Sequence, residues 1–149
     1  MKKIAVVYQS VHHSNTKKVL EHLREKFEFD LFDVKQAENV NFSAYDEVGL
    51  ASGIYFGKLH SKVLEFFEKH LDEIKKVFVI YTCGDGRKKH GKKYEKFFRK
   101  RGLDFSGAFH CKGYDTFGPF KIIGGIAKKH PDEKDLANAC VFFENILKN

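Results

Sequence analysis

Residues 4–18 read IAVVYQSVHHSNTKK, and this stretch decides how the chain folds. The apolar run at residues 4–8 predicts a buried parallel strand, because strands covered on both faces are continuously hydrophobic. A helical pattern opens at Asn15, with Val19, Leu20 and Leu23 spaced to share one face. A strand that leads through a short polar loop into a helix is the first half of a parallel α/β unit.

The loop between this strand and helix predicts an anion site. The first backbone N–H groups of a helix have no partner within the helix, and they and the helix dipole attract negative charge. Polar side chains in the loop can add hydrogen bonds to phosphate oxygens; they belong to Ser10, Ser14, Asn15 and Thr16. A ligand that carries phosphate is therefore the first hypothesis.

Strand and helix patterns alternate along the remaining sequence. The patterns predict strands at 3–9, 29–34, 47–52, 77–81 and 104–111, and helices at 15–27, 61–70 and 87–101, with a last helix that starts at 131–133. Five strands that alternate with helices predict one α/β domain over residues 1–149. Its sheet is mostly parallel and doubly wound, with helices on both faces.

Unusual sequences follow four of these strands directly, and the fourth, from about Lys112 to His130, is the longest. In doubly wound sheets, ligands bind beyond the carboxyl ends of the strands, where the strand order reverses. The second segment comprises Ser52, Gly53, Ile54, Tyr55, Phe56 and Gly57, and the third comprises Thr82, Cys83, Gly84, Asp85 and Gly86. Either Tyr55 or Phe56 offers a stacking surface for a flat apolar ring, and the backbone of both segments can meet its polar edge. A single phosphate joined to such a ring describes FMN.

Other phosphate-binding folds fit less well. The first loop lacks the Gly-Lys-Ser/Thr of an ATP-binding P-loop, and no Gly-x-Gly-x-x-Gly follows the first strand. A receiver domain requires carboxylates at its strand ends, but these ends read Gln9-Ser10 and Ala51-Ser52.

Taken in order, the first three segments resemble the flavodoxin family over nearly the whole chain. The stretch from Ser10 to Asn15-Thr16 is similar to the family's phosphate loop, and residues 52–57 and 82–86 lie where its two flavin-flanking loops belong. The resemblance implies the strand order 2-1-3-4-5, FMN as cofactor and a role in electron transfer. It places Ser10, His12, His13, Ser14, Asn15 and Thr16 at the phosphate, and the residues of the second and third segments at the ring.

The chain departs from the well-known flavodoxins in three places. The phosphate loop carries His12-His13, which either lie on an exposed loop or supply one imidazole to the phosphate. The segment 112–130 is long and glycine-rich, and it either forms a lid or makes turns. The third departure is charge: residues 87–101 hold nine Lys or Arg and one Glu, and the remainder of the chain holds 18 basic and 19 acidic residues.

This basic segment has two interpretations. It is a solvated helix whose Tyr94, Phe97 and Phe98 pack inward, or it is a docking surface for an acidic redox partner. An alternative function is an FMN-dependent NAD(P)H:quinone-type oxidoreductase, in which the basic helix attracts NAD(P)H phosphates. A third is a flavin-free binding module that uses the basic helix. No nucleic-acid motif accompanies the segment, so we expect no nucleic-acid partner.

The cysteines and the apolar runs complete the prediction. Cys83, Cys111 and Cys140 show no Cys-x-x-Cys spacing, which favours a reducing cytoplasm over a disulfide framework or a metal site. We expect Cys83 and Cys111 to be small apolar core residues. No apolar run approaches the roughly 20 residues of a membrane span, and the N-terminus lacks the pattern of a signal peptide. A cytoplasmic protein is expected.

Overall fold

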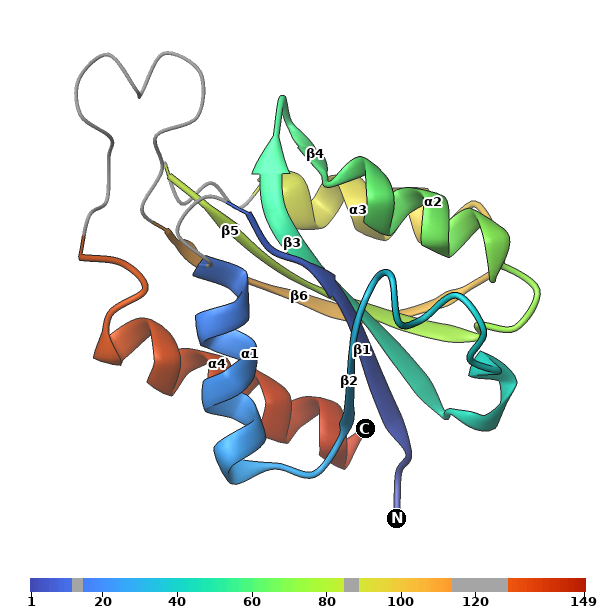
Figure 1. Ribbon diagram of the computed structural model, residues 1–149, viewed down its shortest axis with the longest axis horizontal. Helices are drawn as coiled ribbons and strands as arrows, with labels where there is room; N and C mark the ends of the chain where they lie inside the picture. Colours follow the sequence, from blue (N-terminus) through green and yellow to red (C-terminus); the bar gives the residue numbers. More distant parts are fainter. Residues whose placement is uncertain (12–14, 85–88, 114–128) are drawn as a thin grey trace.

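The structure is a computed structural model that describes residues 1–11, 15–84, 89–113 and 129–149 (Figure 1). Its elements are β1 Ile4–Gln9, α1 Asn15–Lys26, β2 Asp30–Asp33, the 3-10 helix η1 Phe42–Ala44, β3 Glu47–Tyr55, β4 Lys58–Leu59, α2 Ser61–Lys69, β5 Lys76–Cys83, α3 Lys89–Arg99, β6 Asp104–Lys112 and α4 Glu133–Lys148. Among these residues, no helix is long and apolar enough to cross a bilayer.

Five long strands form a parallel sheet in the order β2-β1-β3-β5-β6. The short strand β4 pairs antiparallel with β3 and stands outside this path. With β4 set aside, the order is the predicted 2-1-3-4-5, so the prediction of a flavodoxin-like doubly wound sheet is confirmed. Strand β2 lies on one side of β1, and β3 lies on the other side. The strand order therefore reverses at β1, and the carboxyl ends of β1 and β3 form the topological switch point.

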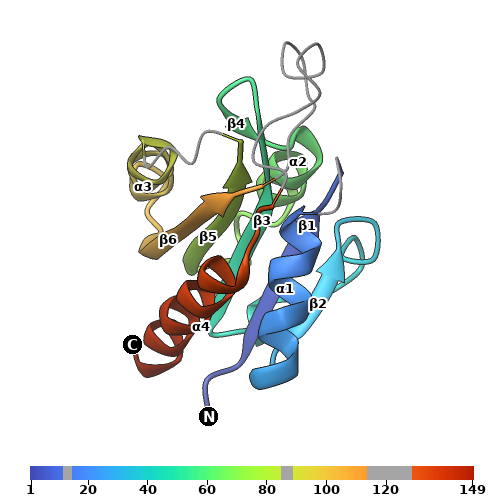
Figure 2. The same cartoon turned by 90° about the vertical axis from the view of Figure 1, so that its left-hand side faces the viewer.

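The helices cover both faces of the sheet (Figure 2). Helices α1 and α4 pack on one face, and α2 and α3 pack on the other. Strand β5 supplies both cores, because successive side chains of a strand point to opposite faces. Val79 and Tyr81 lie with α2 and α3, whereas Phe78 and Ile80 lie with α1 and α4.

Two strands extend further than their sequences predict. β3 continues past Ser52 to Tyr55, since pairing of Ile54 with Leu59 on β4 prolongs its ladder. β5 continues to Cys83, since Thr82 and Cys83 pair with β6. Parts of the two predicted loops are therefore strand ends, which fixes their backbone more firmly than a loop would.

The basic helix ends two residues before the end of the predicted segment 87–101. α3 spans Lys89–Arg99, and Arg87 and Lys88 lie outside the described residues. Its Tyr94 and Phe98 are buried and Phe97 packs against the same core, as predicted. The helix thus presents its aromatic residues to the sheet and its cationic residues to solvent.

Candidate functional site

The predicted segments meet at the carboxyl edge of the sheet. Gln9 of β1 lies beside Ser52 of β3, and Gly53 lies beside Thr82 of β5. Thr82 in turn pairs with Cys111 of β6. This register brings the ends of four neighbouring strands to one edge, where the sequence predicts a ligand site.

The N-terminus of α1 is joined to this edge by side-chain hydrogen bonds. The Lys17 N–H donates to Ser10 Oγ at 3.3 Å, so Ser10 caps the first turn of the helix. The hydroxyls of Thr16 and Thr82 lie 3.1 Å apart in a buried contact. Asn15 and Thr16 are themselves buried. The start of α1 is therefore fixed against the ends of both β1 and β5.

Gly113, just after β6, closes the same corner. Its N–H donates to the Cys83 carbonyl at 3.3 Å. A Cβ on Gly113 would lie 2.6 Å from Nδ2 of Asn15 and 2.9 Å from its Cβ, so a larger residue would collide with the start of α1. The absence of a side chain lets the chain after β6 approach the helix N-terminus.

A two-residue turn joins β3 to β4. Phe56 and Gly57 both have positive φ, at 51° and 79°, which is the conformation that suits a tight hairpin. The Phe56 side chain is 87% exposed, whereas Tyr55 is half-buried. The two aromatic residues that the sequence singles out therefore stand at the rim of the sheet, with Phe56 outermost. We call residues 55–59 the aromatic turn.

His60 supports the aromatic turn from the start of α2. Its ring lies edge-on to the Tyr55 ring, with centroids 5.3 Å apart and an interplanar angle of 84°. Its Nδ1 accepts the Lys62 N–H at 3.0 Å and caps α2. Burial lowers the pKa of His60, with a further contribution from the Lys62 charge and an opposing one from Glu65. The neutral ring is therefore the form that fits this structure.

Ser52 uses its hydroxyl within the protein. Ser52 Oγ accepts the His60 N–H at 2.9 Å and donates to the Gly53 carbonyl at 2.7 Å. The residue is fully buried. These bonds tie the end of β3 to the start of α2, so the Ser52 side chain shapes the aromatic turn from below.

A groove of about 1020 Å³ runs between the aromatic turn and α2. Apolar side chains of Val11, Tyr55, Phe56, Leu59 and Leu64 contribute to its walls. Val11, which follows the first strand, is 38% exposed. The first loop and the aromatic turn thus present apolar surface to the same groove.

The basic helix contacts the aromatic turn. Lys93 Nζ donates to the Gly57 carbonyl at 2.9 Å, and the Leu59 N–H donates to Tyr94 Oη at 2.8 Å. Other cations of this segment pair with carboxylates: Arg99 with Glu95 at 3.2 Å, and Arg101 with Glu68 at 3.3 Å. The exposed lysines of the helix and the residue that follows it are Lys89, Lys92, Lys93, Lys96 and Lys100.

Cys111 lies behind the site as a buried thiol. Burial raises its pKa far above the ordinary value, and the nearby Asp135 and Cys83 raise it further. A thiol held in its protonated form is a poor nucleophile, which supports its predicted role as a small core residue.

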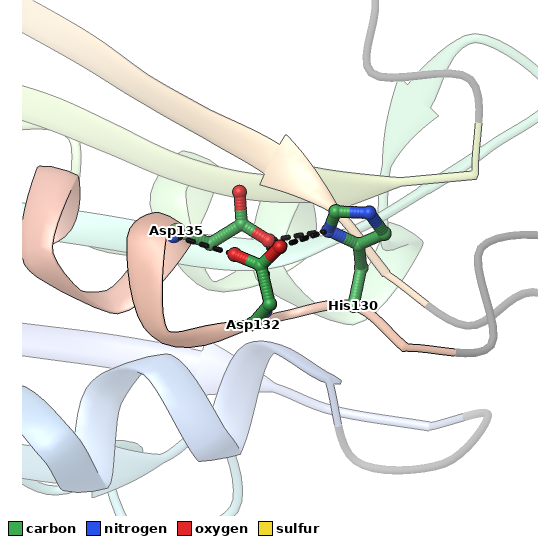
Figure 3. Close-up of side chains that lie close together, drawn as sticks. All are labelled: His130, Asp132 and Asp135. Carbon is green, nitrogen blue, oxygen red and sulfur yellow. Dashed lines mark hydrogen bonds and ion pairs between the residues drawn. The ribbon is translucent and has the colours of Figure 1, made fainter.

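A His–Asp–Asp cluster lies at the N-terminus of α4 (Figure 3). His130 Nδ1 is 2.6 Å from an Asp135 carboxylate oxygen and 3.6 Å from one of Asp132. Asp132 Oδ1 accepts the Asp135 N–H, and Asp135 Oδ2 accepts the Asp132 N–H, both at 2.9 Å. One ligand atom from each of the three residues lies within 4.8 Å of the others. The bonds are those of a capping box, which stabilises the start of the helix.

Some predicted site residues lie outside the described ranges. They are His12, His13, Ser14 and Asp85, together with Gly86 and most of the segment 112–130. Four residues that join the segments of this edge are not predicted as site residues from the sequence: His60, Lys93, Tyr94 and Gly113. A histidine directly before an amphipathic helix signals a cap, but the other three contacts join segments far apart in the sequence.

Comparisons with known proteins agree with this architecture. A profile described as "Flavodoxin domain" matches residues 5–133. An uncharacterized protein from Methanocaldococcus jannaschii is 35% identical over 149 residues, covering 99% of each chain.

Solved structures show the same fold. Oxidised flavodoxin 1 from Bacillus cereus superposes with a TM-score of 0.68 at 16% identity, covering 99% of both chains. A Fusobacterium nucleatum flavodoxin bound to flavin mononucleotide gives a TM-score of 0.63 at 15% identity and covers 99% of this chain and 98% of that one. With the profile spanning most of the sequence and the predicted strand order present, this chain belongs to the flavodoxin family.

Proposed function

We propose that the chain binds FMN at the carboxyl edge of the sheet and carries electrons to or from another protein. The observation that carries this proposal is the meeting of the α1 N-terminus, the aromatic turn and the end of β5 at the switch point. Flavodoxin holds FMN at this place in the fold, and family membership supports FMN as the cofactor here.

The residues at this edge fit a ligand with an anionic end and an apolar body. The first turn of α1 begins at Asn15, shortly after β1, and the Ser10 hydroxyl lies at this turn, where it accepts the Lys17 N–H. On the other side, Phe56 and Val11 are large apolar residues exposed to solvent. An exposed aromatic ring at a concave edge is the arrangement that a flat ligand covers.

In this proposal, each segment has a separate task. The α1 N-terminus, with Ser10, Asn15 and Thr16, binds the phosphate, and His12, His13 and Ser14 are predicted to contact it as well.

The aromatic turn flanks the ring through Tyr55 or Phe56 and excludes water from it. The backbone of Thr82, Cys83 and Gly84, with the predicted Asp85, faces the polar edge of the ring. Bound FMN supplies the redox chemistry, and the protein sets its potential and its access to partners.

The charge of α3 favours a carrier that meets an acidic partner. Its exposed lysines lie on the helix whose Lys93 contacts the aromatic turn. A cationic face beside the redox centre steers an anionic protein into contact and raises the rate of association. The alternative, an FMN-dependent NAD(P)H:quinone-type oxidoreductase, uses the same charge to attract NAD(P)H phosphates.

One kinetic experiment separates these two functions. The FMN-loaded protein is mixed with NADH or NADPH and a soluble quinone, without any partner protein, and nicotinamide absorbance is followed. The carrier proposal predicts no oxidation above that of free FMN, and rapid reoxidation of photochemically reduced protein by a one-electron acceptor. Sustained turnover of NAD(P)H contradicts the carrier role and assigns the oxidoreductase function instead.

A further inference from the structure

The aromatic turn has a conformation that needs support. Phe56 has φ of 51°, a left-handed backbone that aromatic side chains rarely adopt, and its side chain is 87% exposed. Such a residue keeps its conformation only where neighbouring structure holds it. The ladder beneath it is short, because β4 consists of Lys58 and Leu59 alone.

Helix α3 supplies that support at two points of the turn. Lys93 Nζ donates to the Gly57 carbonyl at 2.9 Å, at the tip. The Leu59 N–H donates to Tyr94 Oη at 2.8 Å, where the turn becomes β4. Tyr94 is only 2% exposed, so its hydroxyl is a fixed acceptor rather than a surface group. Two consecutive residues of α3 therefore each make a hydrogen bond to the backbone of the aromatic turn.

The helix is itself anchored, so these bonds have a firm base. Phe98 packs edge-on against Phe67 of α2 at 4.9 Å, and Tyr94 belongs to the same buried cluster. Arg101, two residues beyond α3, pairs with Glu68 of α2 at 3.3 Å and lies 3.7 Å from the Phe97 ring centroid. Figures 1 and 2 both show α2 and α3 below the turn between β3 and β4.

We propose that Lys93 and Tyr94 are positioning residues that hold the aromatic turn in its cofactor-flanking conformation, so that the basic helix orders the FMN site as well as carrying charge. The inference rests on the proposed binding of FMN. It makes the contact of α3 with the turn part of the binding site: a turn that is ordered beforehand costs less conformational entropy when the ring binds.

The test uses four variants of the full chain. Lys93→Met removes the ammonium donor and keeps the alkyl chain, and Lys93→Arg restores a cationic donor. Lys96→Met removes the same charge from the same helix, one turn further along. Tyr94→Phe removes the acceptor of the Leu59 N–H, and its thermal unfolding is recorded to verify that it folds.

Two measurements are made on each variant. Hydrogen exchange of residues 55–60 is followed in the protein without FMN, and FMN affinity is measured by fluorescence quenching. We expect Lys93→Met to exchange these amides about fivefold faster and to bind FMN about fivefold more weakly than Lys96→Met, the effect of one lost hydrogen bond. Lys93→Arg should recover most of both losses. Tyr94→Phe should accelerate exchange at Leu59.

The outcomes distinguish this inference from the proposed function. Wild-type protein that fails to bind FMN overturns the proposed function, and this inference with it, whatever the exchange data show. Wild-type protein that binds FMN, with Lys93→Met equal to Lys96→Met in both measurements, overturns the positioning role alone. Faster exchange without any loss of affinity also overturns it, because the turn would then be held by α3 to no effect on binding.

Discussion

The hydroxyl oxygens of Thr16 and Thr82 lie 3.1 Å apart, in a buried contact between the first turn of α1 and the end of β5. The two residues are separated by 66 positions in the sequence. Their contact joins the predicted phosphate loop to the predicted ring-binding segment. A ligand that bridges these two segments therefore meets a frame whose parts are already fixed relative to one another.

Removing these two hydroxyls should lower the stability of the protein, and the effects of the two substitutions should not be additive. Thr82→Val preserves shape but removes a buried hydroxyl, and we expect it to lower the free energy of unfolding by about 1–2 kcal/mol. The double variant Thr16→Val/Thr82→Val should cost about 1 kcal/mol less than the sum of the single variants, because the second change leaves no hydroxyl stranded. Urea unfolding of the four proteins gives these values. Strictly additive losses would show that the two hydroxyls do not interact.

Protonation of His60 should loosen the start of α2. Burial holds the pKa of His60 below its usual 6.5, so folding favours the neutral ring. The stability that the neutral ring contributes is complete above pH 6.5 and is lost as the pH falls from there toward the lowered pKa. The protonated ring can no longer accept the Lys62 N–H.

Two variants isolate this effect. His60→Asn keeps a side-chain acceptor at the N-cap without a titrating group, and His60→Ala should cost about 1 kcal/mol above pH 6.5, where the wild-type ring is neutral and caps the helix. Denaturant unfolding is measured from pH 8 to pH 5. Wild type should lose stability relative to His60→Asn only below about pH 6.5. A constant difference across this interval would rule out His60 as the titrating group.

Gly113→Ala tests the closed corner beside α1. The added Cβ would lie 2.6 Å from the Asn15 side chain, so either the start of α1 or the chain after β6 must move. Such overpacking costs about 1–3 kcal/mol, and we expect weaker FMN binding with it because the predicted phosphate loop ends at Asn15. Gly91→Ala, in α3, is the control for a methyl group added at a tight site away from α1, because its Cβ would lie 3.1 Å from the Ala108 Cβ. Normal FMN affinity in Gly113→Ala would separate this corner from the ligand site.

The charge of α3 should govern electron exchange with small ions. Reduced, FMN-loaded protein should react with hexacyanoferrate(III), an anion, at a rate that falls as ionic strength rises, and with hexaamminecobalt(III), a cation, at a rate that increases. The pair of substitutions Lys96→Glu and Lys100→Glu should weaken both trends, whereas Lys26→Glu, at the far end of α1, should leave them unchanged. Identical salt dependence in all three proteins would remove the basic helix from the path of charged partners.

Much of this fold is predictable because its strands and helices have strong local signals. The apolar runs of β1 and β5 and the amphipathic pattern of α1 identify these elements without any tertiary information. Strand ends are harder, because pairing decides them: β3 extends to Tyr55 only because β4 folds back on it. Phe56-Gly57 is also an unusual pair for a two-residue hairpin, which most often uses Asn or Gly at its first position.

The site is predictable in its parts and not in its connections. Residues of the first loop and the aromatic turn stand out by type and by their place after strands. The contacts of Lys93 with Gly57 and of Gly113 with Asn15 arise from tertiary packing, which no spacing in a single sequence records. The basic helix is an example: its charge can be counted in the sequence, but its hydrogen bonds to the aromatic turn cannot be predicted from it.

A comparison of FMN binding with riboflavin binding tests the proposed phosphate site, because the two ligands share the ring and differ in the phosphate. Flavin fluorescence is titrated with the purified chain at constant ionic strength. We expect FMN fluorescence to be quenched at one equivalent, with riboflavin bound at least about tenfold more weakly, because it lacks the phosphate that we propose the α1 N-terminus binds. Unquenched FMN, or riboflavin bound as tightly as FMN, would contradict a phosphate site at the end of β1.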